Sequence, residues 1–170
     1  MPKYIILLLL SLSSLRSFAQ HDVPPTTEFA ITGAVKKPMK VTISAMLQMP
    51  QDAIGDVTIT NHRGDPKTTV KQLKGVLLKT LLDSAGILSV KPKDLSEIMI
   101  RLIASDGYKN VYSWNELFNT EVGNHVYIIT TMDGKPMDQV DGRILVLSLS
   151  DMVSGRRHLK GLATVEVVKM

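Results

Sequence analysis

Four basic side chains fall within five residues in the stretch SGRRHLKG, near the end of the printed sequence. They are Arg156, Arg157, His158 and Lys160. Guanidinium groups hold phosphate in a fixed bidentate geometry, so this cluster is typical of an anion or phosphate clamp. A run of charges is equally typical of a solvated turn. The residues alone leave both interpretations open.

A second group of polar side chains follows a β-branched strand in the stretch VTITNHRGD, residues 57–65. We expect the strand to end at Thr60, because the Gly-Asp-Pro triplet at residues 64–66 favours a loop. Between strand and loop lie Asn61, His62 and Arg63. The histidine and the arginine could add a second set of donors to an anion site.

Other arrangements of reactive side chains are weaker candidates. The four histidines share no metal-ligand spacing, and the sequence contains no cysteine, which leaves out a disulfide and a cysteine nucleophile. Residues 150–158 include the residue types of a hydrolase triad, but without a nucleophile elbow they are better interpreted as a polar turn. Asp106 and Glu116 could do acid–base chemistry, yet each also fits as a turn former or a helix cap.

The first residues have the pattern of an exported protein. The stretch MPKYIILLLLSLSSLRSFAQ carries Lys3, a short apolar run and a small-residue cleavage site, which predicts a secretory signal over residues 1–19. The apolar run is too short for a bilayer-spanning helix. We therefore expect a periplasmic or secreted protein that does not span the membrane.

The overall charge argues against nucleic acid as a partner. The formal net charge is +4, from 20 basic and 16 acidic residues, and it includes Lys3 and Arg16 of the predicted signal. Removing these two leaves a net of about +2. No basic stripe interleaved with aromatic residues is present, so we expect no nucleic-acid binding.

The apolar pattern predicts one α+β domain over residues 28–170, after a flexible lead over residues 20–27. Strands are expected near residues 28–35, 57–60, 97–105, 125–132, 143–150 and 162–168. Helices are expected near residues 42–49 with Thr42 as N-cap, near residues 75–86 with Gly86 at the end, and from Ser113 in capping-box spacing with Glu116. Six or seven strands with two or three short helices, not in strict alternation, indicate a mainly β member of the α+β class.

Five segments in series resemble a known family. They are FAITGAVKKPMKVTISAML, LKGVLLKTLLDSAGI, ASDGYKNVYSWNEL, MDGKPM with DGRILVLSLSD, and RRHLKGLATVEVV. In this order they resemble the molybdopterin-binding domain of the sulfite-oxidase-like oxidoreductases, above all its small exported single-domain members. The resemblance covers Phe29 to Val168. It implies that family's fold, with a cleft that takes a pterin and its phosphate.

One position departs from the catalytic members of that family. In those members a cysteine at the end of the strand that matches VTIT binds molybdenum, and the matching residue here is Asn61, give or take one position. A thiolate is a soft ligand that an amide or a hydroxyl does not replace well. The resemblance therefore implies a pterin-binding protein without sulfite-oxidase-type catalysis, and it does not favour bound molybdenum. Some similar short proteins pass a pterin signal to a membrane-bound partner.

The resemblance also implies roles for three groups of side chains in the cleft. Thr60, Asn61, His62 and Arg63 would line the former metal end; Arg156, Arg157, His158 and Lys160 would hold the phosphate; Asp106 and Tyr108 would contact the ring. Of the basic residues, Arg157 and Lys160 fall nearest the family's basic positions.

Two other functions stay open at this point. One is an oxidoreductase that holds the molybdenum cofactor without the cysteine bond and works with an electron-transfer partner. The other is a protein-interaction module built on a relic of the fold.

Overall fold

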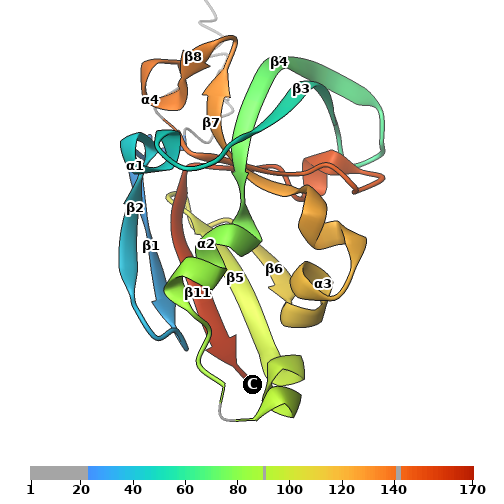
Figure 1. The fold of residues 1–170 in the computed structure, drawn as a ribbon. Coiled ribbons are helices and arrows are strands. Elements are labelled where there is room, and N and C mark those ends of the chain that lie inside the picture. The colour runs from blue at the N-terminus through green and yellow to red at the C-terminus, as the bar shows by residue number, and fades with distance from the viewer. Residues whose placement is uncertain (1–22, 90, 141–142) are drawn as a thin grey trace, which may run out of the picture.

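The computed structural model describes residues 23–89, 91–140 and 143–170. The predicted signal over residues 1–19 and the start of the predicted lead, residues 20–22, lie outside the described residues. In the described part of the chain, two β-sheets and several short helices form the domain (Figure 1). No helix in these ranges is long and apolar enough to cross a membrane.

The first sheet has five strands in the order β2-β1-β11-β5-β6. The strands are β1 Glu28–Gly33, β2 Met39–Thr42, β5 Ile98–Ala104, β6 Lys109–Ser113 and β11 Leu162–Lys169. β1 runs parallel to β11, and the other pairs are antiparallel. Every second residue of β5 is buried, as expected for a strand with one face on the core.

The second sheet follows the order β10-β9-β7-β4-β3, with β8 paired to β7, and all its pairs are antiparallel. Its strands are β3 Asp52–Thr60, β4 Pro66–Leu77, β7 Val126–Met132, β8 Lys135–Pro136, β9 Leu145–Ser148 and β10 Leu159–Lys160. In Figure 1, β3 and β4 form a long arm that arches over the domain. Three register shifts bend this arm and make its free edge a poor template for a further strand.

The helices are short, and two of them, α1 and α3, begin at their predicted N-caps. They are α1 Ile43–Leu47, α2 Leu78–Ala85, α3 Trp114–Phe118 and α4 Met137–Val140, with the 3₁₀ helices η1 Pro92–Glu97, η2 Glu121–His125 and η3 Ser154–Arg156. Thr42 caps α1 by accepting from the Ala45 amide at 3.1 Å. Ser113 caps α3 by accepting from the Glu116 amide at 3.0 Å. Both N-caps are confirmed.

The predicted helix over residues 75–86 starts later than expected, at Leu78. The preceding three residues, 75–77, pair with β7, because Gly75 lets the two backbones approach closely: an added Cβ would lie 2.8 Å from the Ile128 carbonyl oxygen. The helix ends as predicted, since Gly86 follows it with a φ of 67°. Pairing with β7 outweighs the helical pattern in these three residues.

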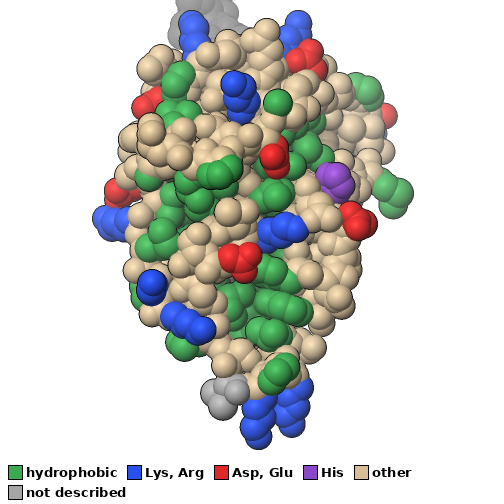
Figure 2. Space-filling model, in the orientation of Figure 1, with side chains coloured by type: hydrophobic (Ala, Val, Ile, Leu, Met, Phe, Trp, Pro, Cys, Tyr) green, Lys and Arg blue, Asp and Glu red, His purple; other side chains and the backbone are tan. Residues whose placement is uncertain are grey.

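One apolar core is shared by both sheets and by α2, which buries Leu78, Leu81, Leu82 and Ala85. This burial explains the strength of the helical pattern in that segment. On the face drawn in Figure 2, acidic and basic side chains are interspersed and form no single patch. The architecture is α+β and mainly β, which confirms the predicted fold class.

Leu82→Ala should lower the free energy of unfolding by about 2–5 kcal/mol, because Leu82 has no exposed surface and its truncation leaves a cavity. Thr80→Ala, on the exposed side of the same helix, should change the stability by less than about 0.5 kcal/mol. Urea denaturation of both variants measures this. Equal losses would show that α2 does not pack on the core as described.

Candidate ligand pocket

The loop that carries the basic cluster is hydrogen-bonded to two segments that are distant from it in the sequence. At the end of β3, the Thr60 amide donates to Ser154 Oγ at 3.0 Å. From the turn between β5 and β6, the Tyr108 hydroxyl donates to the Arg156 carbonyl at 2.7 Å. The loop of residues 154–160 is therefore fixed between the two sheets, and its side chains have defined directions.

Gly155 allows the loop to approach β3 this closely. A Cβ at this position would lie 2.0 Å from the Thr60 carbonyl oxygen, a distance that no side chain tolerates. The glycine is required for the contact between η3 and the end of β3. Further along, Asn110 donates to the Arg157 carbonyl at 3.0 Å and holds the other end of η3.

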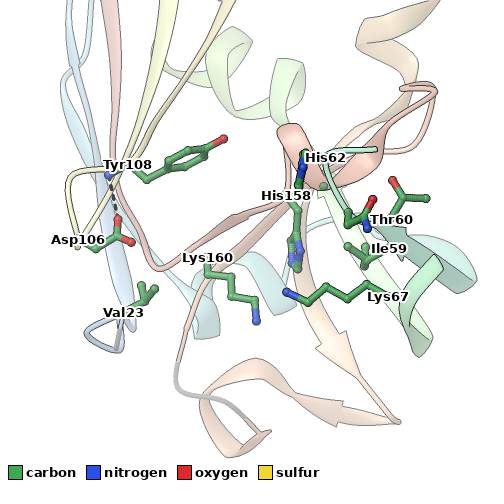
Figure 3. A pocket seen from close by; sticks show the side chains of 11 residues that line it. Val23, Ile59, Thr60, His62, Lys67, Asp106, Tyr108, His158 and Lys160 are labelled. Carbon is green, nitrogen blue, oxygen red and sulfur yellow. Dashed lines mark hydrogen bonds between the residues drawn. The ribbon is translucent and has the colours of Figure 1, made fainter. Parts of the chain in front are cut away.

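A cavity of about 420 Å³ opens where these segments meet (Figure 3). Its walls are Val23, Ile59, Thr60, Asn61, His62, Lys67, Asp106, Tyr108, Gly155, His158 and Lys160. The volume lies within the range of small-molecule sites, which is about 300–1,000 Å³. The wall combines an aromatic face, an acidic group and several basic groups, a combination suited to a polar, charged ligand.

Seven of the ten sequence-predicted site residues line this one cavity. They are Thr60, Asn61, His62, Asp106, Tyr108, His158 and Lys160. The other three, Arg63, Arg156 and Arg157, do not line it. Arg156 and Arg157 border a separate, more open hollow with Asp151 and Met152, and Arg63 is exposed in the turn after β3.

Arg157, one of the two basic residues nearest the family's positions, is engaged by carboxylates. Its guanidinium group contacts Glu116 at 2.6 Å and Asp151 at 3.4 Å, and it lies 4.5 Å from the centre of the Tyr112 ring. Burial lowers the pKa of this guanidinium group, but the interactions with Glu116, Tyr112 and Asp151 together outweigh burial, so the net shift is upward. This arginine ties the loop to α3, and a phosphate would have to compete with two carboxylates for it.

Asn61, which the resemblance aligns to within one position with the family's metal-binding cysteine, closes a turn. Its Oδ1 accepts from the amides of Arg63 at 2.8 Å and Asp65 at 3.1 Å, and its Nδ2 donates to the Asp65 carboxylate at 3.0 Å. This is an Asx turn with the side-chain amide satisfied at both ends. The Asn61 side chain therefore forms part of the cavity wall, and its amide is already bonded and not free to coordinate a metal.

His158 is a largely buried histidine placed between two lysines. Burial lowers its pKa first, and the charges of Lys160 and Lys67 lower it further, to about 4. Its Nε2 is buried and has no hydrogen-bond partner among the described residues. Figure 3 shows Lys67 and Lys160 extending toward the same part of the cavity as the His158 ring. The imidazole is therefore neutral at pH 7, and the local charge is carried by the lysines.

Asp106 and Tyr108 form the opposite wall. Asp106 Oδ1 accepts from the Tyr108 amide at 2.9 Å and thereby closes the turn between β5 and β6. The Tyr108 side chain is 46% exposed, and its hydroxyl is held by the Arg156 carbonyl. The ring is consequently fixed in direction and presents an aromatic face to the cavity.

Sequence reasoning missed four residues of the cavity wall, Val23, Ile59, Lys67 and Gly155. Lys67 lies at the start of β4, a strand that the polar stretch PKTTVKQLKG does not indicate by apolar alternation. Val23 belongs to the lead predicted as flexible. In the structure its carbonyl accepts from Arg143 Nε at 2.8 Å, and the Pro24 carbonyl accepts from Ser105 at 2.6 Å. No local pattern signals these long-range contacts.

The comparisons with known proteins give a likeness in structure alone. No family profile and no protein of curated function matches the sequence. Among solved structures, the chain is similar to the sulfane dehydrogenase SoxCD from Paracoccus pantotrophus, with a TM-score of 0.62 and 14% identity. The match covers 85% of this chain and 38% of that one. The likeness concerns the fold alone and is consistent with the mainly β, sulfite-oxidase-like fold; this chain spans well under half of the chain that it matches.

The group implied by the resemblance is a molybdenum-bearing pterin. The pocket residues suit the pterin and its phosphate but not the molybdenum ion. A planar ring with a phosphate suits a cavity with an aromatic wall and two lysines. A molybdenum ion does not suit it, because Asn61 offers only an amide that is already bonded. Within the described ranges, no cluster of three or more carboxylates or histidines could replace the thiolate.

His158→Gln should make the stability of the protein less sensitive to acid. Because the folded-state pKa lies below the unfolded value near 6.5, the unfolded chain binds a proton first, and stability falls from about pH 6.5 toward pH 4. This loss amounts to at most about 3 kcal/mol. Urea denaturation at pH 7.5 and pH 4.5 measures it in the parent and the variant. The same loss in both would mean that His158 titrates normally.

Gly155→Ala should destabilise the protein by about 1–3 kcal/mol, since the added methyl group meets the Thr60 carbonyl. Gly107→Ala provides the control for a glycine-to-alanine change near the cavity: nothing lies within 4 Å of its Cβ, and only its φ of 85° resists the change. Thermal unfolding with urea titration compares the two. A smaller effect at Gly155 than at Gly107 would contradict the described contact between η3 and β3.

Proposed function

We propose that this chain binds a phosphate-bearing pterin of the molybdopterin type in the cavity and that it does so without redox catalysis. The observation that carries the proposal is the convergence of Tyr108, Lys67 and Lys160 on one cavity of about 420 Å³. An aromatic face and paired cations are what a planar heterocycle with a phosphate requires. The resemblance in the order of segments and the sulfite-oxidase-like fold support the same ligand class.

Each part of the cavity would do separate work on such a ligand. Tyr108, fixed through its hydroxyl, would stack on the ring, and the Asp106 carboxylate would accept hydrogen bonds from ring N–H groups. Lys67 and Lys160 would neutralise the phosphate. His158 would remain uncharged in the empty pocket and would not add a third positive charge there.

The absence of catalysis in this proposal rests on the donor set at the former metal end. A molybdenum ion held by protein needs a soft ligand, and Asn61 supplies an amide already committed to its turn. A bound pterin would then serve as a signal or a stored ligand. The export pattern of residues 1–19 supports a periplasmic or extracellular site of action. The family resemblance adds a membrane-bound protein as the partner in this proposal.

Lys160→Met should weaken binding of a phosphorylated pterin by about 1.5–3 kcal/mol, the net worth of a hydrogen bond to a charged group. Binding of the same pterin without phosphate should change much less, because it lacks the charge that Lys160 neutralises. Pterin fluorescence in a titration measures both affinities. The control is Lys135→Met, an exposed lysine on β8 outside the cavity.

Two results would contradict the proposal. Equal affinity of the parent and Lys160→Met for the phosphorylated ligand would place the phosphate elsewhere. Molybdenum copurifying in a fixed ratio with a pterin, together with electron transfer to an acceptor dye, would show that the chain is an oxidoreductase despite Asn61.

A further inference from the structure

We propose that the cavity is a proton-coupled oxyanion site, in which an oxyanion bound between Lys67 and Lys160 causes His158 to take up one proton. The inference deepens the proposed pocket and rests on its location, but it concerns inorganic oxyanions as much as a phosphate on a larger ligand. Proton uptake by His158 is a separate property of the site, because a pterin can stack and form hydrogen bonds there without it. The geometry of three basic groups around one cavity carries it.

His158 lines the cavity with Lys67 and Lys160, and its Nε2 is buried without a hydrogen-bond partner among the described residues. A buried polar atom without a partner costs free energy, and none of the described residues 23–89, 91–140 and 143–170 satisfies it. A ligand that brings negative charge into the cavity changes this balance.

In the empty cavity, burial and the two lysine charges disfavour the imidazolium form. A divalent oxyanion placed between the lysines offsets their charges at His158, so the positive form becomes favourable by direct attraction. Binding of the anion and binding of the proton therefore assist one another, and the assistance is reciprocal by linkage.

The other titratable groups around the cavity are few. They are His62 in the turn after β3, Asp106 and Tyr108 in the turn between β5 and β6, Lys67 on β4 and Lys160 on β10. Asp106 accepts from the Tyr108 amide through Oδ1, which leaves Oδ2 for a ligand. Among the described cavity residues the second histidine is His62, and it is exposed, whereas His158 is partly buried with a buried Nε2. His62 is therefore the group that the experiment has to separate.

Inorganic sulfate is the probe of choice, because it carries two charges without titrating between pH 5 and pH 8. Isothermal calorimetry at low ionic strength should show sulfate binding that is at least about fivefold tighter at pH 5.5 than at pH 7.5. Repeating the titration in two buffers of different ionisation enthalpy should give an uptake of up to one proton for each sulfate bound.

Variants locate the proton and the anion. His158→Gln should bind sulfate with little pH dependence, whereas His62→Gln and the exposed control His125→Gln should keep the parent's dependence. Lys67→Met and Lys160→Met should each lose at least about tenfold in sulfate affinity, and Lys135→Met should lose none. NMR of the His158 ring in the parent, with and without sulfate, reports the same proton uptake and does not depend on any variant folding.

Each outcome bears on the inference. Sulfate affinity in the parent that is independent of pH, or a pH dependence that survives His158→Gln and disappears in His62→Gln, overturns it. Pterin binding with no proton uptake on sulfate binding would leave the proposed function intact and remove this inference. Proton-coupled sulfate binding without any pterin affinity would support this inference and contradict the proposed function.

Discussion

The close contact between η3 and the end of β3 is the constraint on which the pocket depends. Gly155 allows that contact, and the Thr60 amide to Ser154 hydrogen bond fixes it. Once it is made, the Tyr108 hydroxyl can reach the Arg156 carbonyl, and the turn of the five-stranded sheet is tied to the loop that enters β10. The cavity is the space left between these tied segments, so its shape is set by backbone packing more than by its own side chains.

The same packing divides the basic cluster into two functions. Arg157 points toward Glu116 and Asp151, where it holds the loop to α3 and covers the Tyr112 ring. His158 and Lys160 face the cavity, where Lys67 from the second sheet joins them. Arginine suits the structural task because its planar group can serve two carboxylates at once, while the lysines leave mobile charges available to a ligand.

Sequence alone predicted much of the fold for identifiable physical reasons. The caps at Thr42 and Ser113 and the glycine after α2 depend on neighbours three or four residues away, and all three are present in the structure. The strand β4 was missed because its first residues are polar and lie on an exposed arm, where pairing with β3 and not burial fixes the strand.

In the candidate site, too, the local sequence predicts some residues, and contacts between distant segments determine the others. Seven predicted residues reach the cavity because they lie at or next to the ends of strands β3, β5, β6 and β10, which meet there. Lys67 was missed with its strand, and the pairing of Arg157 with Glu116 joins residues 41 positions apart, which no local pattern encodes. Charge and residue type indicated an anion site, but only tertiary packing decides which cations are available to it.

The central claim is that the cavity holds a phosphate-bearing pterin without molybdenum. Native mass spectrometry of the protein, purified gently without added ligand, tests this most directly, combined with mass analysis of the released small molecule and elemental analysis of the same sample. We expect a bound species of pterin mass with a phosphate group, and molybdenum far below one equivalent. A protein that carries no small molecule at all, or a pterin with stoichiometric molybdenum, would contradict it.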